Sequence, residues 1–101
     1  MSGTDKLHVY TGPGGDVMTV LTERGKTHGD FVQQALTSQL VKNIFRGQTN
    51  WERLSWCQQD ALDMIAVKLS RILTGDPNVK DHWTDIAGYA TLVAQQLKDP
   101  T

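Results

Sequence analysis

This sequence of 101 residues has one cysteine, a net charge close to zero and no long apolar run. A single cysteine, Cys57, excludes an intramolecular disulfide and a Cys-rich zinc cluster. Ten Lys and Arg residues balance eleven Asp and Glu residues, and no segment is densely basic, which argues against duplex nucleic acid as the main partner. The apolar runs are too short to enter a membrane, and residues 1–6 lack the pattern of a signal peptide. We therefore expect a cytoplasmic protein.

The sequence has enough apolar residues for one small domain. Hydrophobic residues make up 39% of the chain, which suits one core and excludes two. Residues 1–15 contain four of the nine glycines, a density that opposes helix formation and predicts a flexible arm. The GPGG stretch at 12–15 lacks the Gly-Lys-Ser/Thr ending of a phosphate loop, so we interpret it as a turn. The folded domain is expected at residues 16–98.

Two helices are predicted in the first half of this domain. Asp16 is suited to cap a short helix that ends near Gly25. Asp30 is suited to cap a second helix that ends at Gly47, because apolar residues follow it at three- and four-residue spacings. That stripe consists of Phe31, Val32, Ala35, Leu36, Leu40, Val41, Ile44 and Phe45.

Two more helices are predicted in the second half. The third begins near Thr49 or Asn50, ends before Gly75 and should be the longest, and Asp81 is placed to cap the fourth. Their apolar stripes are Leu62, Ile65, Leu69, Ile72 and Leu73, followed by Trp83, Ile86, Ala90, Val93 and Leu97. With short links and no sustained strand-like alternation, the sequence predicts an all-α antiparallel bundle of three long helices and one short N-terminal helix.

The third helix has a second face on which polar and apolar residues mix. At about 100° per residue, Asp60, Asp63, Met64, Val67 and Arg71 fall together, nearly opposite the apolar stripe. Burial would contribute about 1.5–3 kcal/mol for Met64 and the same for Val67, so we expect partial burial against a helix or a second subunit. The predicted partner surface consists of Trp51, Trp56, Met64, Val67 and Tyr89, and we expect a homodimer.

Two pairs of aspartates have spacings that suit a metal site. The predicted Mg²⁺ ligands are Asp60, Asp63, Asp81 and Asp85, whose carboxylates supply the hard oxygens that Mg²⁺ prefers. Lys68 and Arg71, one turn apart, are the predicted phosphate contacts. Gly88 costs about 1 kcal/mol relative to alanine inside a helix, which indicates close approach of a neighbouring backbone or a ligand.

Each aspartate also has a purely structural interpretation, and both interpretations stay open. Asp81 is suited to be a helix cap, and Asp85 to complement the helix dipole. Asp60 and Asp63 are suited to structural salt bridges with Lys68, Arg71 or Arg24.

Five runs of residues form a recognisable combination. They are 24–31 (RGKTHGDF), 50–51 (NW), 61–65 (ALDMI), 68–77 (KLSRILTGDP) and 81–90 (DHWTDIAGYA). Over roughly residues 20–97, this combination resembles a family of small bacteriophage proteins of uncharacterised function. More distantly, it resembles the MazG-type all-α nucleoside triphosphate pyrophosphohydrolases, in which an ExxE pair and an ExxD pair on two helices bind Mg²⁺. That resemblance implies that Asp60 and Asp63 match the first pair, and Asp81 and Asp85 the second.

Two functions follow as hypotheses. The first is a phage-encoded, MazG-like protein that binds a nucleotide with Mg²⁺ and, if it is an enzyme, hydrolyses it. The second is a noncatalytic phage protein that binds and inhibits a host protein. A metal or nucleotide should raise the melting temperature under the first hypothesis, and a partner protein under the second.

Overall fold

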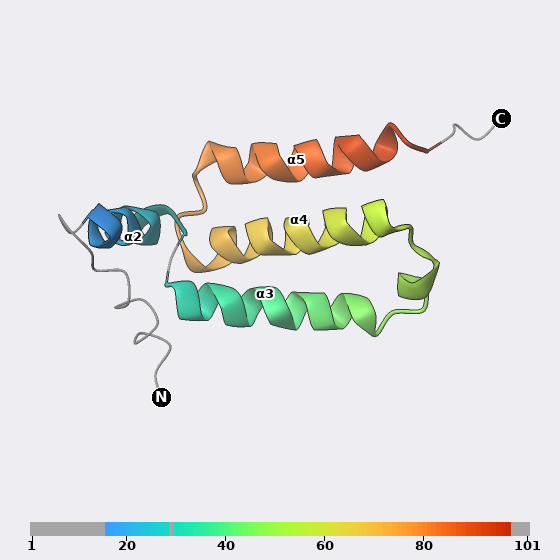
Figure 1. Cartoon of the computed structure of the whole chain (residues 1–101), viewed down its shortest axis with the longest axis horizontal. Coiled ribbons are helices and arrows are strands. Elements are labelled where there is room, and N and C mark those ends of the chain that lie inside the picture. Colours follow the sequence, from blue (N-terminus) through green and yellow to red (C-terminus); the bar gives the residue numbers. More distant parts are fainter. Residues whose placement is uncertain (1–15, 29, 98–101) are drawn as a thin grey trace.

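The computed structural model describes residues 16–28 and 30–97 (Figure 1). All the regular secondary structure in this part of the chain is helical. In chain order the elements are α2 (Asp16–His28), α3 (Phe31–Arg46), the short 3₁₀ helix η2 (Trp51–Arg53), α4 (Trp56–Thr74) and α5 (Lys80–Ala94). The prediction of an all-α fold is confirmed. The predicted arm at residues 1–15 lies outside the described residues. Every helix described is too short or too polar to span a lipid bilayer.

The three long helices lie side by side with alternating directions, and α4 is in the middle (Figure 1). Both α3 and α5 pack along α4, on opposite sides of it, while contacts between α3 and α5 are minor or absent in the described part of the chain. The short α2 lies where α3 begins and α4 ends, and it contacts both. The antiparallel arrangement agrees with the prediction, and the long helices form a layer in which only α4 has two long neighbours.

The local signals in the sequence place the ends of α3 correctly and the end of α2 incorrectly. The Asp30 carboxylate accepts a hydrogen bond from the Val32 amide at 3.2 Å, and Gly47 closes the helix, so both predicted ends of α3 are confirmed. The predicted end of α2 is wrong. This helix continues past Gly25 to His28, because one glycine lowers helix propensity without ending a helix.

The predicted start of the third helix is also wrong. Asn50 precedes only the single turn η2, and its side chain makes no capping hydrogen bond. The chain becomes extended at Leu54, and α4 starts at Trp56 with Ser55 as its cap. Ser55 Oγ accepts a hydrogen bond from the Gln58 amide at 3.1 Å, and Gln58 Oε1 accepts one from the Ser55 amide at 2.8 Å. This reciprocal capping box satisfies two amides at the helix start. At 19 residues, α4 is the longest described helix, as predicted.

The fourth helix begins before the residue predicted to cap it. Val79 is the N-cap of α5, and Asp81 lies inside the first turn without a capping hydrogen bond. There its carboxylate complements the positive end of the helix dipole. The helix ends at Ala94, so Leu97 lies beyond its last turn.

Small side chains dominate the buried part of the layer. The buried apolar residues are Ala61, Ala66 and Ile72, and the buried polar residues are Ser38, Ser70 and His82. Of the larger apolar residues predicted for the core, about half are exposed, Leu73 most of all at 69%, and all the others except Ile72 are half-buried. Trp83 is 54% exposed, and its indole N–H donates to the Pro77 carbonyl at 2.8 Å. The layer is therefore held by close approach of helix backbones more than by large interlocking side chains.

Replacing Ser55 with alanine tests which residue caps α4. We expect Ser55→Ala to lower the free energy of unfolding by about 1 kcal/mol, because the Gln58 amide loses Ser55 Oγ as its hydrogen-bond acceptor. Asn50→Ala is the matched control and should leave stability nearly unchanged. Urea denaturation measures both, and an equal loss in the two variants would contradict the assignment of Ser55 as the cap.

Candidate functional site

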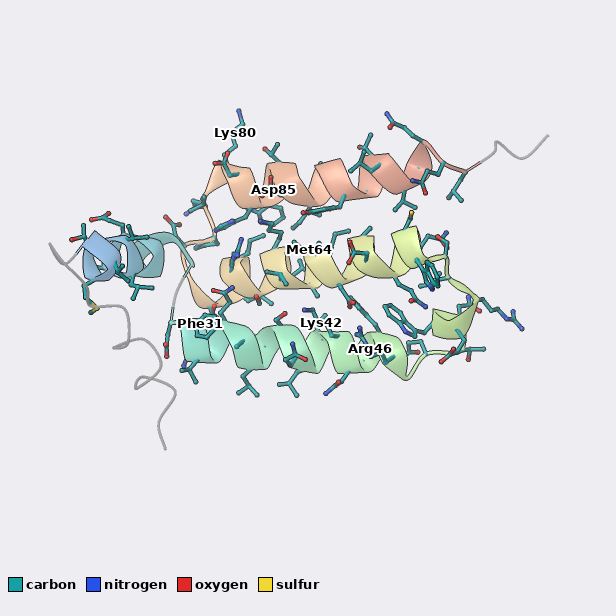
Figure 2. All side chains as sticks on the ribbon, viewed as in Figure 1. Phe31, Lys42, Arg46, Met64, Lys80 and Asp85 are labelled. Atoms are coloured by element: carbon teal, nitrogen blue, oxygen red, sulfur yellow. The ribbon has the colours of Figure 1, made fainter. Side chains whose placement is uncertain are left out.

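Two ion pairs join α4 to its neighbours. On the α3 side, the Arg46 guanidinium binds the Asp63 carboxylate through two hydrogen bonds of 3.1 and 2.8 Å. On the α5 side, Lys68 Nζ lies 2.9 Å from Asp85 Oδ2. The Lys68 side chain is only 12% exposed, so this pair is partly shielded from water. Figure 2 labels Arg46 on α3 and Asp85 on α5, on either side of α4.

Arg46 also organises the turn between α3 and α4. Its guanidinium carbon lies 4.8 Å from the centre of the Trp51 ring, and this ring stacks on Phe45 with centroids 6.1 Å apart. The hydrogen bond to Asp63 raises the pKa of Arg46 above its ordinary value. The positive guanidinium is attracted to the face of the Trp51 ring. Gln59 Nε2 donates to the Trp51 carbonyl at 2.9 Å and fixes η2 to α4. Trp51, which was predicted to contact a partner, thus packs against Arg46 and Phe45 of its own chain.

The structure does not bring the four predicted metal ligands together. Asp63 is directed to α3 by Arg46, whereas Asp85 lies beside Lys68. Lys68 lies level with Asp85, because the two side chains form an ion pair. Asp60 precedes Lys68 by eight residues and therefore lies about 12 Å from Asp85 along the α4 axis. In residues 16–28 and 30–97, no group of three or more His, Cys, Asp or Glu side chains could hold a metal ion. The salt-bridge interpretation of Asp63 agrees with the structure, but its partner is Arg46, which the sequence analysis did not consider.

An apolar groove lies between α4 and α5. Its volume is about 350 Å³, within the range of small ligand pockets, and Gln58 contributes the single polar side chain of its lining. We call it the apolar groove; its lining residues are Leu54, Gln58, Ala61, Leu62, Ile65, Ala90, Val93, Ala94 and Leu97. Because carboxylates, histidines and cysteines are missing from this lining, the groove suits binding of an apolar group better than chemistry.

Two further hollows, one between α4 and α5 and one along α5, share Tyr89 and Leu92. One, of about 230 Å³, includes Asp60, and the other, of about 430 Å³, includes Asp85 and Gly88. A methyl group built on Gly88 would have no described atom within 4 Å. The close approach predicted at Gly88 is therefore not made by the described part of this chain, and the glycine borders open space.

The remaining predicted site residues differ in exposure. Trp56 is 88% exposed and is directly available to a partner. Met64, Val67 and Tyr89 are half-buried, as expected for Met64 and Val67 (Figure 2 labels Met64 on α4). Arg71, a predicted phosphate contact, is half-buried too. Five of the eight residues in the apolar stripe of α3 are exposed. This exposure depends on the position of α3 at the side of the layer, which the sequence alone does not show.

Substitution of Gly88 tests whether packing within the chain requires it. We expect Gly88→Ala to raise the free energy of unfolding by about 0.5–1 kcal/mol, because alanine has higher helix propensity and meets no neighbour. The control Ala87→Gly, at the adjacent exposed position, should lower stability by a similar amount. Thermal or urea denaturation measures both. A destabilised Gly88→Ala variant would show that something in the chain does approach Gly88.

Comparison with known proteins places the chain in a family without a described activity. No curated protein and no solved structure matches it. The model of a family described as a domain of unknown function, DUF6378, matches residues 17–97. Because this match spans most of the chain and all the described helices, the protein belongs to the DUF6378 family.

Proposed function

We propose that this protein acts by binding another protein in the apolar groove, without catalysing a reaction. The observation that supports this function is the lining of the groove, in which eight of nine residues are apolar. A partner that covers such a surface lowers the free energy by about 25 cal/mol for each Å² of apolar area removed from water. The groove lies between two antiparallel helices, a shape that accepts the apolar face of an amphipathic helix.

The charged residues favour this function over hydrolysis. Arg46 holds Asp63, and Lys68 holds Asp85, so two of the four predicted metal ligands already have cationic partners. A divalent ion would have to displace these cations and gather carboxylates that lie on different sides of α4. The resemblance to small phage proteins makes a host protein the proposed class of partner, with steric inhibition as the mode of action.

A charge placed in the apolar groove tests this function. Ala90 is exposed and lines the groove, whereas Ala87 is also exposed on the same helix and does not line it. We expect the immobilised wild-type protein and Ala87→Glu to retain one host protein in stoichiometric amount from a bacterial lysate. Ala90→Glu should lose it, because a carboxylate buried against an apolar partner is strongly unfavourable.

The result that contradicts protein binding in the groove is equally specific. The proposal fails if Ala90→Glu retains the same host protein as the wild type, or if the wild type retains none at stoichiometric amount. Circular dichroism of the three proteins confirms that each remains helical.

A Mg²⁺-bound nucleotide at Asp85 is the second candidate, and one observation favours it. Lys68 and Asp85 form an ion pair, and Asp85 lines the hollow that Gly88 leaves open. Mg²⁺ is commonly bound by one or two carboxylates together with substrate phosphates, so it does not require four aspartates. In this function Asp85 would hold the metal, and Lys68 would move from Asp85 to a phosphate group.

Thermal denaturation with nucleoside triphosphates and Mg²⁺ tests the second candidate. A ligand at 100 times its Kd stabilises the folded state by about 2.7 kcal/mol, which raises Tm by several degrees. The wild type and Asp81→Asn should show this shift, and Asp85→Asn should not. Absence of a shift in the wild type across a panel of nucleotides with Mg²⁺ would exclude this function.

A further inference from the structure

The start of α4 carries an indole ring and a carboxylate that have no polar partner among the described residues. Trp56 is 88% exposed, the highest value of any large apolar residue in the described part of the chain. Asp60 is exposed too, and its carboxylate forms no ion pair or hydrogen bond with a described residue. Residues four apart on a helix lie next to each other, with Cβ atoms about 5–6 Å apart. The two side chains are therefore neighbours on one face of α4.

An arginine fills a site of the same composition elsewhere in this chain. The Arg46 guanidinium donates two hydrogen bonds to the Asp63 carboxylate, and its central carbon lies 4.8 Å from the centre of the Trp51 ring. A guanidinium suits both groups, because it forms parallel hydrogen bonds with a carboxylate and is attracted to the face of an indole ring. Trp56 and Asp60 supply the same two groups without an arginine.

The nearest cation along the chain does not fill this second site. Arg53 is exposed in η2, and it forms no ion pair or ring contact with a described residue. The positive end of the α4 dipole acts mainly within the first turn of the helix, whereas Asp60 lies in the second turn. The Asp60 carboxylate is therefore available to a cation from outside the chain.

The hollow beside Asp60 has room for the apolar part of a side chain. It measures about 230 Å³, and Tyr89 and Leu92 also line it. At about 100° per residue, the direction of Asp60 lies between those of Trp56 and Cys57, and Cys57 lines the hollow. The indole is thus on one side of the carboxylate and the hollow on the other. The methylene groups of an arginine can lie along such a surface while the guanidinium stays at the carboxylate.

We propose that Trp56 and Asp60 bind an arginine side chain of a partner polypeptide. The guanidinium binds the Asp60 carboxylate and stacks on the Trp56 ring, as Arg46 does at its own pair of groups. Lysine suits the site less well, because an ammonium group has no planar face to stack on the indole. Trp56 and Asp60 lie on the side of α4 opposite to Leu62 and Ile65 of the apolar groove, so this site does not rest on the function proposed for the groove.

Titration of the full chain with a capped Gly-Arg-Gly tripeptide tests the proposal. Nuclear magnetic resonance of the Trp56 indole N–H and the Asp60 backbone amide follows binding at the site. We expect saturable shifts of both signals, with a Kd in the millimolar range. Two matched peptides should bind at least fivefold more weakly. One contains citrulline, which keeps the shape of arginine and lacks its charge, and the other contains lysine.

Single substitutions test the two groups separately. Asp60→Asn and Trp56→Leu should each weaken binding of the arginine peptide at least fivefold. The indole N–H reports on the first variant, and the backbone amide of residue 60 on the second. Asp81→Asn is the matched control, because it removes another exposed carboxylate, at the start of α5, and changes the net charge equally. It should bind like the wild type. Circular dichroism confirms that each variant remains helical.

Four results would overturn the proposal. The wild type shows no saturable shift up to about 50 mM peptide, a concentration well above the expected Kd. The citrulline peptide binds as tightly as the arginine peptide, or the lysine peptide does. Asp81→Asn weakens binding as much as Asp60→Asn does. The Ala90→Glu variant of the groove should still bind the arginine peptide, so failure of the groove proposal and failure of this one are distinguishable.

Discussion

The close approach of α3 and α5 to the two sides of α4 is the constraint on which the rest of the structure depends. Ala61, Ala66 and Ser70 on α4 are at most 8% exposed, and their small side chains let neighbouring backbones approach. Because α3 and α5 each have only one long neighbour, their other sides cannot be buried within the layer. Except for Ile72, the larger apolar side chains are left half-buried or exposed, and they line the apolar groove and cover the side of α3 away from α4.

Local signals predicted the helices well and their first residues less well. The ends of α3 followed from Asp30 and Gly47, because the apolar periodicity begins directly after Asp30 and stops just before Gly47. At α4, by contrast, Asn50 and Ser55 are both good caps, and apolar periodicity does not choose between them. The chain begins its long helix at Ser55 because Gln58 completes a reciprocal capping box there. A Ser-x-x-Gln pattern was visible in the sequence and would have indicated this start.

The candidate site was harder to predict because it depends on which helices meet, and at what register. Spacing along one helix correctly put Met64 and Val67 on a half-buried face. It could not show that Asp63 faces α3, where Arg46 from 17 residues earlier in the chain binds it. Nor could it show that Asp60 and Asp85 lie at different levels of the α4–α5 pair. The link between α4 and α5 sets this register, and helical periodicity carries no information about it.

Folding and binding are coupled in such a layer. A three-cornered bundle buries the inner faces of all its helices, and its stability is then independent of partners. Here the exposed apolar side chains of α3 and the apolar groove stay in contact with water. Folding alone therefore stabilises the chain less than burial of all its apolar residues would. Any molecule that covers either surface binds the folded state and not the unfolded chain, and therefore adds to stability by mass action. The same exposed side chains that weaken the isolated layer thus make its stability responsive to any molecule that covers them.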